Sequence, residues 1–110
     1  MKLIIAIVQD EDASRLISIM NEQGFRVTKL ATTGGFLRSG NTTLISGVED
    51  DQLQMALDLI EATCRSREQV TATGTGNSQM GGSGFVPYPV KVTVGGATVF
   101  VLEVAQVLKV

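Results

Sequence analysis

An uninterrupted apolar run, residues 3–8, constrains the fold of this chain more than any other segment. Aliphatic and β-branched residues without polar alternation predict a strand that is buried on both faces and lies at the centre of a sheet. Gln9 and Asp10 end the run at once, so it is too short for a signal-peptide core and for a bilayer span. The single cysteine, Cys64, cannot form an intramolecular disulfide. We therefore expect a cytoplasmic protein without membrane contact.

The spacing of apolar residues predicts two helices. The first is expected to begin at Asp10 or Asp12 as a capping residue and to end at Gly24 in the left-handed conformation. The second is expected to begin at the acidic residues 49–51, where negative charge favours a helix start. The apolar stripes at three- and four-residue spacing are Ala13, Leu16, Ile17 and Met20 in the first helix and Leu53, Ala56, Leu57, Ile60 and Cys64 in the second. The helix dipole explains both acidic clusters, and Arg65 and Arg67 at the second helix end, so no metal site is predicted.

The remaining patterned segments predict strands. Residues 25–31 and 41–48 alternate, while residues 90–94 and 97–102 flank Gly95 and Gly96, which predict a two-residue hairpin turn. The element order matches a single α+β domain over residues 1–110 with the ferredoxin-like βαββαβ plan, an extra hairpin strand near the C-terminus and two glycine-rich loops. These loops are residues 32–40 and 65–89, the second unusually long for a compact domain.

The ferredoxin-like plan leaves one face of the sheet without helices. We expect that face to expose Val92, Val94 and Val99. Symmetric association of several copies would cover these apolar positions.

Charge is distributed unevenly along the chain. Residues 25–48 hold Arg26, Lys29 and Arg38 without one carboxylate, although the whole chain has nine Lys and Arg against eleven Asp and Glu. A local excess of cations attracts anionic ligands such as phosphate, carboxylate or nucleotide. The net charge of −2 argues against general nucleic-acid binding. Histidine is absent from the sequence, which removes the commonest general base and metal ligand and favours a binding protein over an enzyme.

The loop sequence ATTGGFLRSGN matches no standard phosphate-binding motif. It includes Gly35, and the apolar pair Phe36 and Leu37 beside that glycine has no role in a solvated turn. We expect this part of the loop to cover a purine face or a neighbouring subunit. A plain glycine-rich connection with exposed cations is the alternative.

Four further side chains and one strand glycine complete the candidate site. Arg26 and Arg38 can bind phosphate oxygens through paired hydrogen bonds, whereas Thr28 and Asn41 can bond a base edge. Gly47 lies inside a predicted strand, where glycine marks a close approach of a ligand or backbone, or else a bulge. The segment therefore predicts a nucleotide site.

Four segments carry a family resemblance: IIAIVQD, TKLATTGGFLRSGNTT, GVEDDQ and YPVKVTVGGATVFV. Over nearly its whole length the chain resembles the cyclic di-AMP receptor family of PII-like signalling proteins. The resemblance implies a ferredoxin-like homotrimer that binds one cyclic di-AMP in each cleft between subunits. It implies signalling to a downstream protein whose identity is unknown, without a cofactor and without catalytic activity. By matching position, it implies these ligand-binding residues: Arg26, Thr28, Phe36, Leu37, Asn41, Gly47 and Phe100. The C-terminal AQVLKV departs from the family pattern.

Two other functions compete with this interpretation. A PII-type sensor of ATP or ADP is disfavoured because residues 68–89 contain no Lys or Arg, whereas a triphosphate of about four charges needs several cationic partners. A small ferredoxin-like phosphatase could use Arg26 for phosphate and Asn41 to orient water. It would lack a proton acceptor, because no histidine or second base accompanies them.

Overall fold

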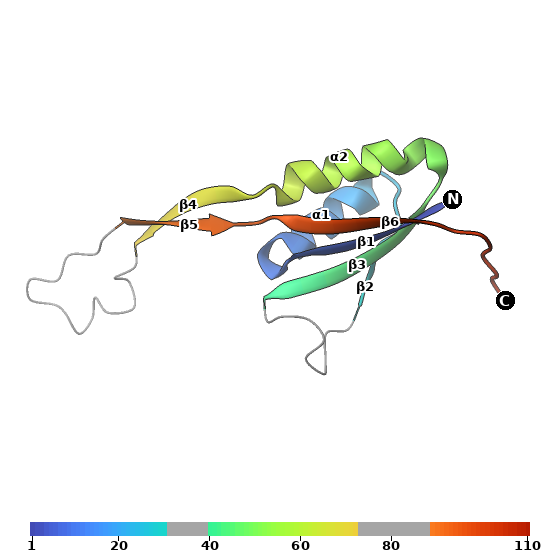
Figure 1. Ribbon diagram of the computed structural model, residues 1–110, viewed down its shortest axis with the longest axis horizontal. Coiled ribbons are helices and arrows are strands. Elements are labelled where there is room, and N and C mark those ends of the chain that lie inside the picture. Colours follow the sequence, from blue (N-terminus) through green and yellow to red (C-terminus); the bar gives the residue numbers. More distant parts are fainter. Residues whose placement is uncertain (31–39, 73–88) are drawn as a thin grey trace, which may run out of the picture.

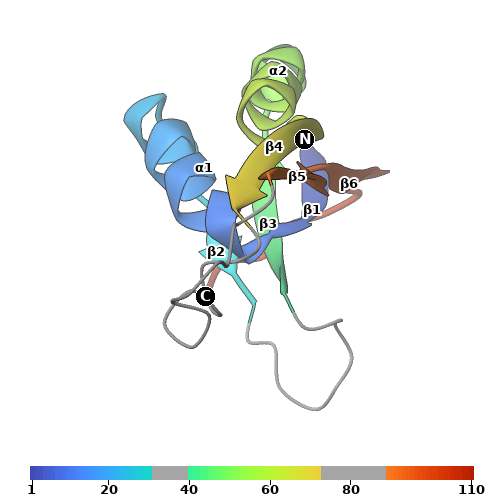
Figure 2. The same cartoon turned by 90° about the vertical axis from the view of Figure 1, so that its left-hand side faces the viewer.

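A four-stranded antiparallel sheet with two helices on one face forms the body of the protein (Figures 1 and 2). The computed structural model describes residues 1–30, 40–72 and 89–110. The elements are β1 (Lys2–Gln9), α1 (Asp10–Glu22), β2 (Thr28–Lys29), β3 (Asn41–Val48), the short 3-10 helix η1 (Asp50–Gln52), α2 (Leu53–Cys64), β4 (Arg67–Ala72), β5 (Pro89–Val94) and β6 (Ala97–Glu103). The sheet order β2-β3-β1-β6 is that of a ferredoxin-like fold, with β6 as its fourth strand. The predicted α+β class is therefore consistent with the structure.

β1 lies between β3 and β6, as its apolar sequence predicts. Ile4, Ala6 and Val8 are buried against the helices, whereas the residues between them are only partly buried on the other face. The prediction that this strand is buried on both faces is therefore wrong for one subunit, because both helices pack on the same side of the sheet.

Both helices bury the apolar stripes that the sequence predicts. The core includes Leu16 and Met20 of α1 and Ala56, Ile60 and Cys64 of α2. Gly24 follows α1 with a φ of +89°, which confirms the predicted left-handed stop. The prediction of an aspartate cap is wrong, since Gln9 occupies the N-cap position and Asp12 points into a buried ion-pair cluster.

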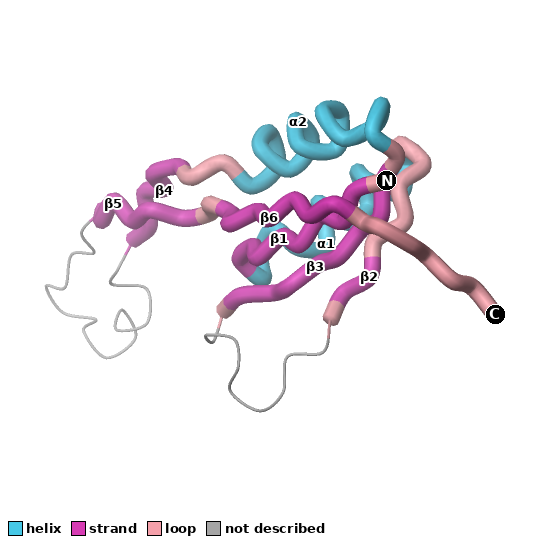
Figure 3. Tube along the Cα trace, turned by 45° about the vertical axis from the view of Figure 1, so that its right-hand side comes forward, coloured by secondary structure: helices cyan, strands magenta, loops and turns pink. Residues whose placement is uncertain are grey.

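A separate two-stranded sheet, which we call the arm, extends from the body (Figure 3). Its strands β4 and β5 pair antiparallel from Arg67 with Val94 to Ala72 with Pro89. The prediction of a structureless loop over residues 65–89 is therefore wrong at residues 67–72. Residues 73–88 lie outside the described part. The predicted β5–β6 hairpin is also wrong, because β5 pairs with β4 in the arm and β6 pairs with β1 in the body.

The helix-free surface of the four-stranded sheet, which we call the open face, carries exposed apolar side chains. Phe100 and Leu102 are 52% and 44% exposed and stand beside Ile5 and Leu3 in the strand register. The sequence prediction of an apolar open face is thus supported, but its residues were misplaced. Val99 packs against the core on the helix side, and Val92 and Val94 belong to the arm.

Candidate ligand-binding site

Arg26, Thr28 and Gly47 come together at one end of the open face. Thr28 in the edge strand β2 pairs with Ile45 of β3. Two residues earlier, Arg26 lies beside Ser46, the neighbour of Gly47, and its carbonyl accepts a hydrogen bond from Ser46 Oγ at 2.6 Å. Val27 between them packs toward the core, so Arg26 and Thr28 point to the open face. β2 covers only Thr28–Lys29, shorter than the predicted strand over residues 25–31.

Arg26 supplies an exposed cation at this end of the sheet. Within residues 1–30, 40–72 and 89–110, its guanidinium forms no ion pair, whereas Arg15, Arg65 and Arg67 are each paired with a carboxylate. No carboxylate of those ranges engages its five donors, which are of the kind that bind an anion such as a phosphate.

Gly47 lies in a regular stretch of strand. The pairing of β1 with β3 continues without interruption from Lys2 with Val48 to Gln9 with Asn41, so Gly47 is not at a bulge. A Cβ atom built on Gly47 would meet only Met1 Sδ, at 3.9 Å. Nothing within the described subunit requires glycine here, and the close approach of a ligand or another copy stays a prediction.

The structure places Asn41 and Phe100 away from this group. Asn41 shares the open face but begins β3, six residues before Gly47, which is about 20 Å along an extended strand. Phe100 lies on the same cross-strand row as Thr28, through Ile45 and Ile5. Three strand spacings separate Phe100 from Thr28, or about 14 Å.

The remaining predicted site residues, Gly35, Phe36 and Leu37, lie outside the described residues, as does Arg38. The loop that carries them joins β2 to β3. The described residues on either side of it follow the edge strand β2 and precede β3, the strand beside β2.

A buried polar cluster at the base of the arm was missed by the sequence analysis. The Asp12 carboxylate is only 1% exposed and accepts hydrogen bonds from Arg67 Nη2 at 2.9 Å and Arg15 Nη2 at 3.3 Å. Its bond to Arg67 is the main cause that raises the pKa of that guanidinium above its ordinary value. Asp12 and Arg67 are 55 residues apart, and no local pattern links them.

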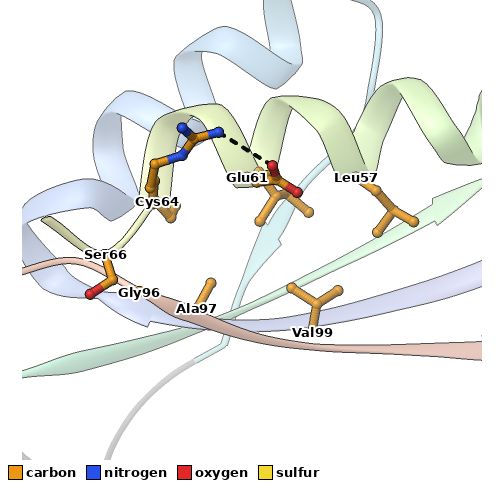
Figure 4. A pocket seen from close by; sticks show the side chains of 9 residues that line it. Leu57, Glu61, Cys64, Ser66, Gly96, Ala97 and Val99 are labelled. Carbon is orange, nitrogen blue, oxygen red and sulfur yellow. Dashed lines mark hydrogen bonds and ion pairs between the residues drawn. The ribbon is translucent and has the colours of Figure 1, made fainter.

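A groove of about 560 Å³ runs between α2 and β6 (Figure 4). Leu57, Cys64 and Val99 line its apolar part, and the Glu61–Arg65 ion pair lies on its rim. Burial, and next the charge of Asp12, raise the pKa of the Cys64 thiol to about 11. The thiol is therefore protonated near neutral pH and supplies no nucleophile.

Among residues 1–30, 40–72 and 89–110, no group of three or more His, Cys, Asp or Glu side chains could hold a metal ion. No helix in the same ranges is long and apolar enough to cross a membrane.

The antiparallel sheet, its two helices and a cation-bearing open face define a ferredoxin-like α+β binding subunit, consistent with the PII-like type. Residues 1–110, the whole chain, match the family model described as cyclic-di-AMP receptor, and the chain belongs to this family. A solved structure from Pediococcus pentosaceus ATCC 25745, described as a functionally unknown protein, is 43% identical with a TM-score of 0.78. The match covers 99% of this chain and 96% of that one.

Proposed function

We propose that this protein is a non-catalytic receptor that binds cyclic di-AMP at the boundary between neighbouring copies in a homotrimer. The family match supports the ligand. The proposed location of the ligand rests on one observation, that the two edges of the open face differ in chemistry. The β2 edge has the cation of Arg26 and the hydroxyl of Thr28, whereas the β6 edge has the exposed apolar side chains of Phe100 and Leu102.

A ligand bound between two copies can contact both edges more easily than a ligand bound to one copy. About 14 Å of sheet separates Thr28 from Phe100, far more than the roughly 3 Å over which a hydrogen bond or a ring contact acts. If the β2 edge of one copy faces the β6 edge of the next, Arg26 and Thr28 contact phosphate and base while Phe100 packs on an adenine. Such an interface joins unlike surfaces, and it forms a closed ring when the rotation from one copy to the next closes. In this proposal the ring has three copies.

Burial of the open face is a second reason for association. Phe100 and Leu102 of the edge strand β6, beside partly buried Leu3 and Ile5 of β1, form an apolar surface on the open face. In the tail beyond β6, the side chain of Leu108 is 77% exposed. Contacts between copies would remove both from water.

The proposal includes both predicted loops, residues 32–40 and 65–89. We expect the ligand to order them in a cytoplasmic protein, the first through Phe36 and Leu37, and a downstream protein to read the altered surface. Unchanged hydrogen exchange in both loops at saturating ligand would contradict this part.

Isothermal titration of the purified protein with cyclic di-AMP, beside ATP and cyclic di-GMP, tests the proposal. We expect selective binding of cyclic di-AMP near one per chain, with a mass in solution of three chains. A response to ATP alone would identify a nucleotide-energy sensor of the PII type. Release of phosphate from a phosphoester or acylphosphate would contradict the non-catalytic assignment.

A further inference from the structure

We propose that the junction between β1 and α1, residues 9–12, couples the ligand-binding loop to the arm through Gln9, Asp10 and Asp12. This inference rests on the proposed function, because it assigns a route by which a ligand at the loop would change the arm. It adds residues that lie outside the candidate ligand site.

On the loop side, the junction holds the first residues after the loop. The backbone N–H of Asp10 donates to the carbonyl of Gly40 at 2.8 Å, and Thr42 Oγ1 donates to the Asp10 carboxylate. Gln9 is paired with Asn41 in the β1–β3 register. A ligand that shifts residues 40–42 therefore acts directly on the junction.

On the arm side, the same junction holds both strands at their base. Gln9 Oε1 accepts a hydrogen bond from the backbone N–H of Gly95 at 2.6 Å, just after β5. The Asp12 carboxylate binds Arg67, the first residue of β4, through Nη2 at 2.9 Å and Nη1 at 3.4 Å. A carboxylate that is 1% exposed strongly favours keeping its charged partners, since an unpaired buried charge is costly.

The junction can transmit a displacement because it contains no loop. β1 ends at Gln9 and α1 begins at Asp10, so strand and helix are continuous. The arm is a fully paired ribbon that joins the body through residues 65–66 and 95–96. A small rotation at its base therefore moves its far end by a larger distance. The junction thus provides the discrete contacts through which two distant sites can be coupled.

The test compares Asp12→Asn with Glu11→Gln in the whole protein. Both variants remove one negative charge from the first turn of α1, but Glu11 is exposed whereas Asp12 holds Arg67. Cyclic di-AMP binding is measured by calorimetry, and amide hydrogen exchange is then followed in β4 and β5 with and without saturating ligand. Gln9→Ala is a third variant that leaves the Asp12 cluster intact, so a folding failure of Asp12→Asn does not end the test.

We expect the wild type and Glu11→Gln to change arm exchange by about fivefold or more on binding, the lower range of allosteric coupling. Asp12→Asn and Gln9→Ala should still bind one ligand per chain, but with a much smaller change in the arm.

Two results would overturn the coupling alone: a bound wild type whose arm exchange is unchanged, or wild-type responses in folded Asp12→Asn and Gln9→Ala. Absence of cyclic di-AMP binding by the wild type would instead overturn the proposed function, and this inference with it.

Discussion

Replacing Gly95 with alanine tests how the base of the arm is built. Gly95 and Gly96 both adopt left-handed backbone, with φ of +82° and +93°. Any L side chain in this conformation costs about 1–2 kcal/mol, so both alanine variants should lose that amount. The two positions differ in what the new methyl group would meet.

At Gly95 the added Cβ would lie 2.4 Å from Arg67 Nη1 and 2.6 Å from the carbonyl oxygen of Arg65. The guanidinium must then move away, and the buried Asp12 carboxylate loses a charge-assisted hydrogen bond, which costs about 1.5–3 kcal/mol. At Gly96 the nearest heavy atom is Ser66 Cβ at 3.9 Å, so only the backbone strain remains. We expect Gly95→Ala to destabilise by about 2.5–5 kcal/mol and Gly96→Ala by about 1–2 kcal/mol.

Urea unfolding followed by circular dichroism, at one fixed protein concentration, gives both free energies of unfolding. Gly24→Ala is a further control, since Gly24 has a φ of +89° and no heavy atom within 4 Å of its added Cβ. Equal destabilisation of all three variants would refute the idea that Gly95 makes room for the Asp12–Arg67 pair.

Three further predictions concern the ligand site and the core. Gly47→Ala should leave the stability of the subunit unchanged or slightly higher, because only Met1 Sδ is near, yet weaken cyclic di-AMP binding in calorimetry. Unchanged binding would remove Gly47 from the site. Arg26→Ala should weaken binding by about 1.5–3 kcal/mol if its guanidinium holds a phosphate, and an unaltered affinity would exclude that contact. Burial raises the pKa of Cys64 from 9.0 to about 11, so the folded state keeps a proton that the unfolded chain loses in this range. The resulting stabilisation, on the order of 3 kcal/mol, is fully present below pH 9 and lost as pH rises toward 11. The difference in urea stability between wild type and Cys64→Ala should therefore shrink over this window, and a constant difference would contradict it.

Local patterns predicted much of the body of the protein. The alternation in residues 41–48 and the helical spacing around Leu16 and Ile60 identify elements whose buried side chains the structure confirms. Such periodicities arise within a few residues and need no knowledge of distant partners. Gly24 was likewise predictable, since its conformation ends a helix locally.

The arm shows where local patterns fail. The sequence REQVTA of β4 begins with polar residues and lacks the apolar alternation of a strand that packs on a core. It is a strand because β5 lies beside it. Gly95 and Gly96 both have the positive φ that a two-residue hairpin turn requires, so the local conformation was foreseen. The chain nevertheless passes into another sheet, because β6 pairs with the free edge of β1.

The candidate site divides in the same way. By itself, the sequence determined that Arg26 and Thr28 share a face, that a cation-rich segment lies in an acidic chain, and that both helices have one apolar stripe. Only the tertiary structure decided that Phe100 shares a cross-strand row with Thr28 and that Asp12 binds Arg67 across 55 residues. The physical reason is the distance along the chain over which each kind of interaction acts. Backbone conformation and side-chain periodicity are set by near neighbours in the chain, whereas strand pairing and buried ion pairs depend on surfaces that meet only when the chain has folded.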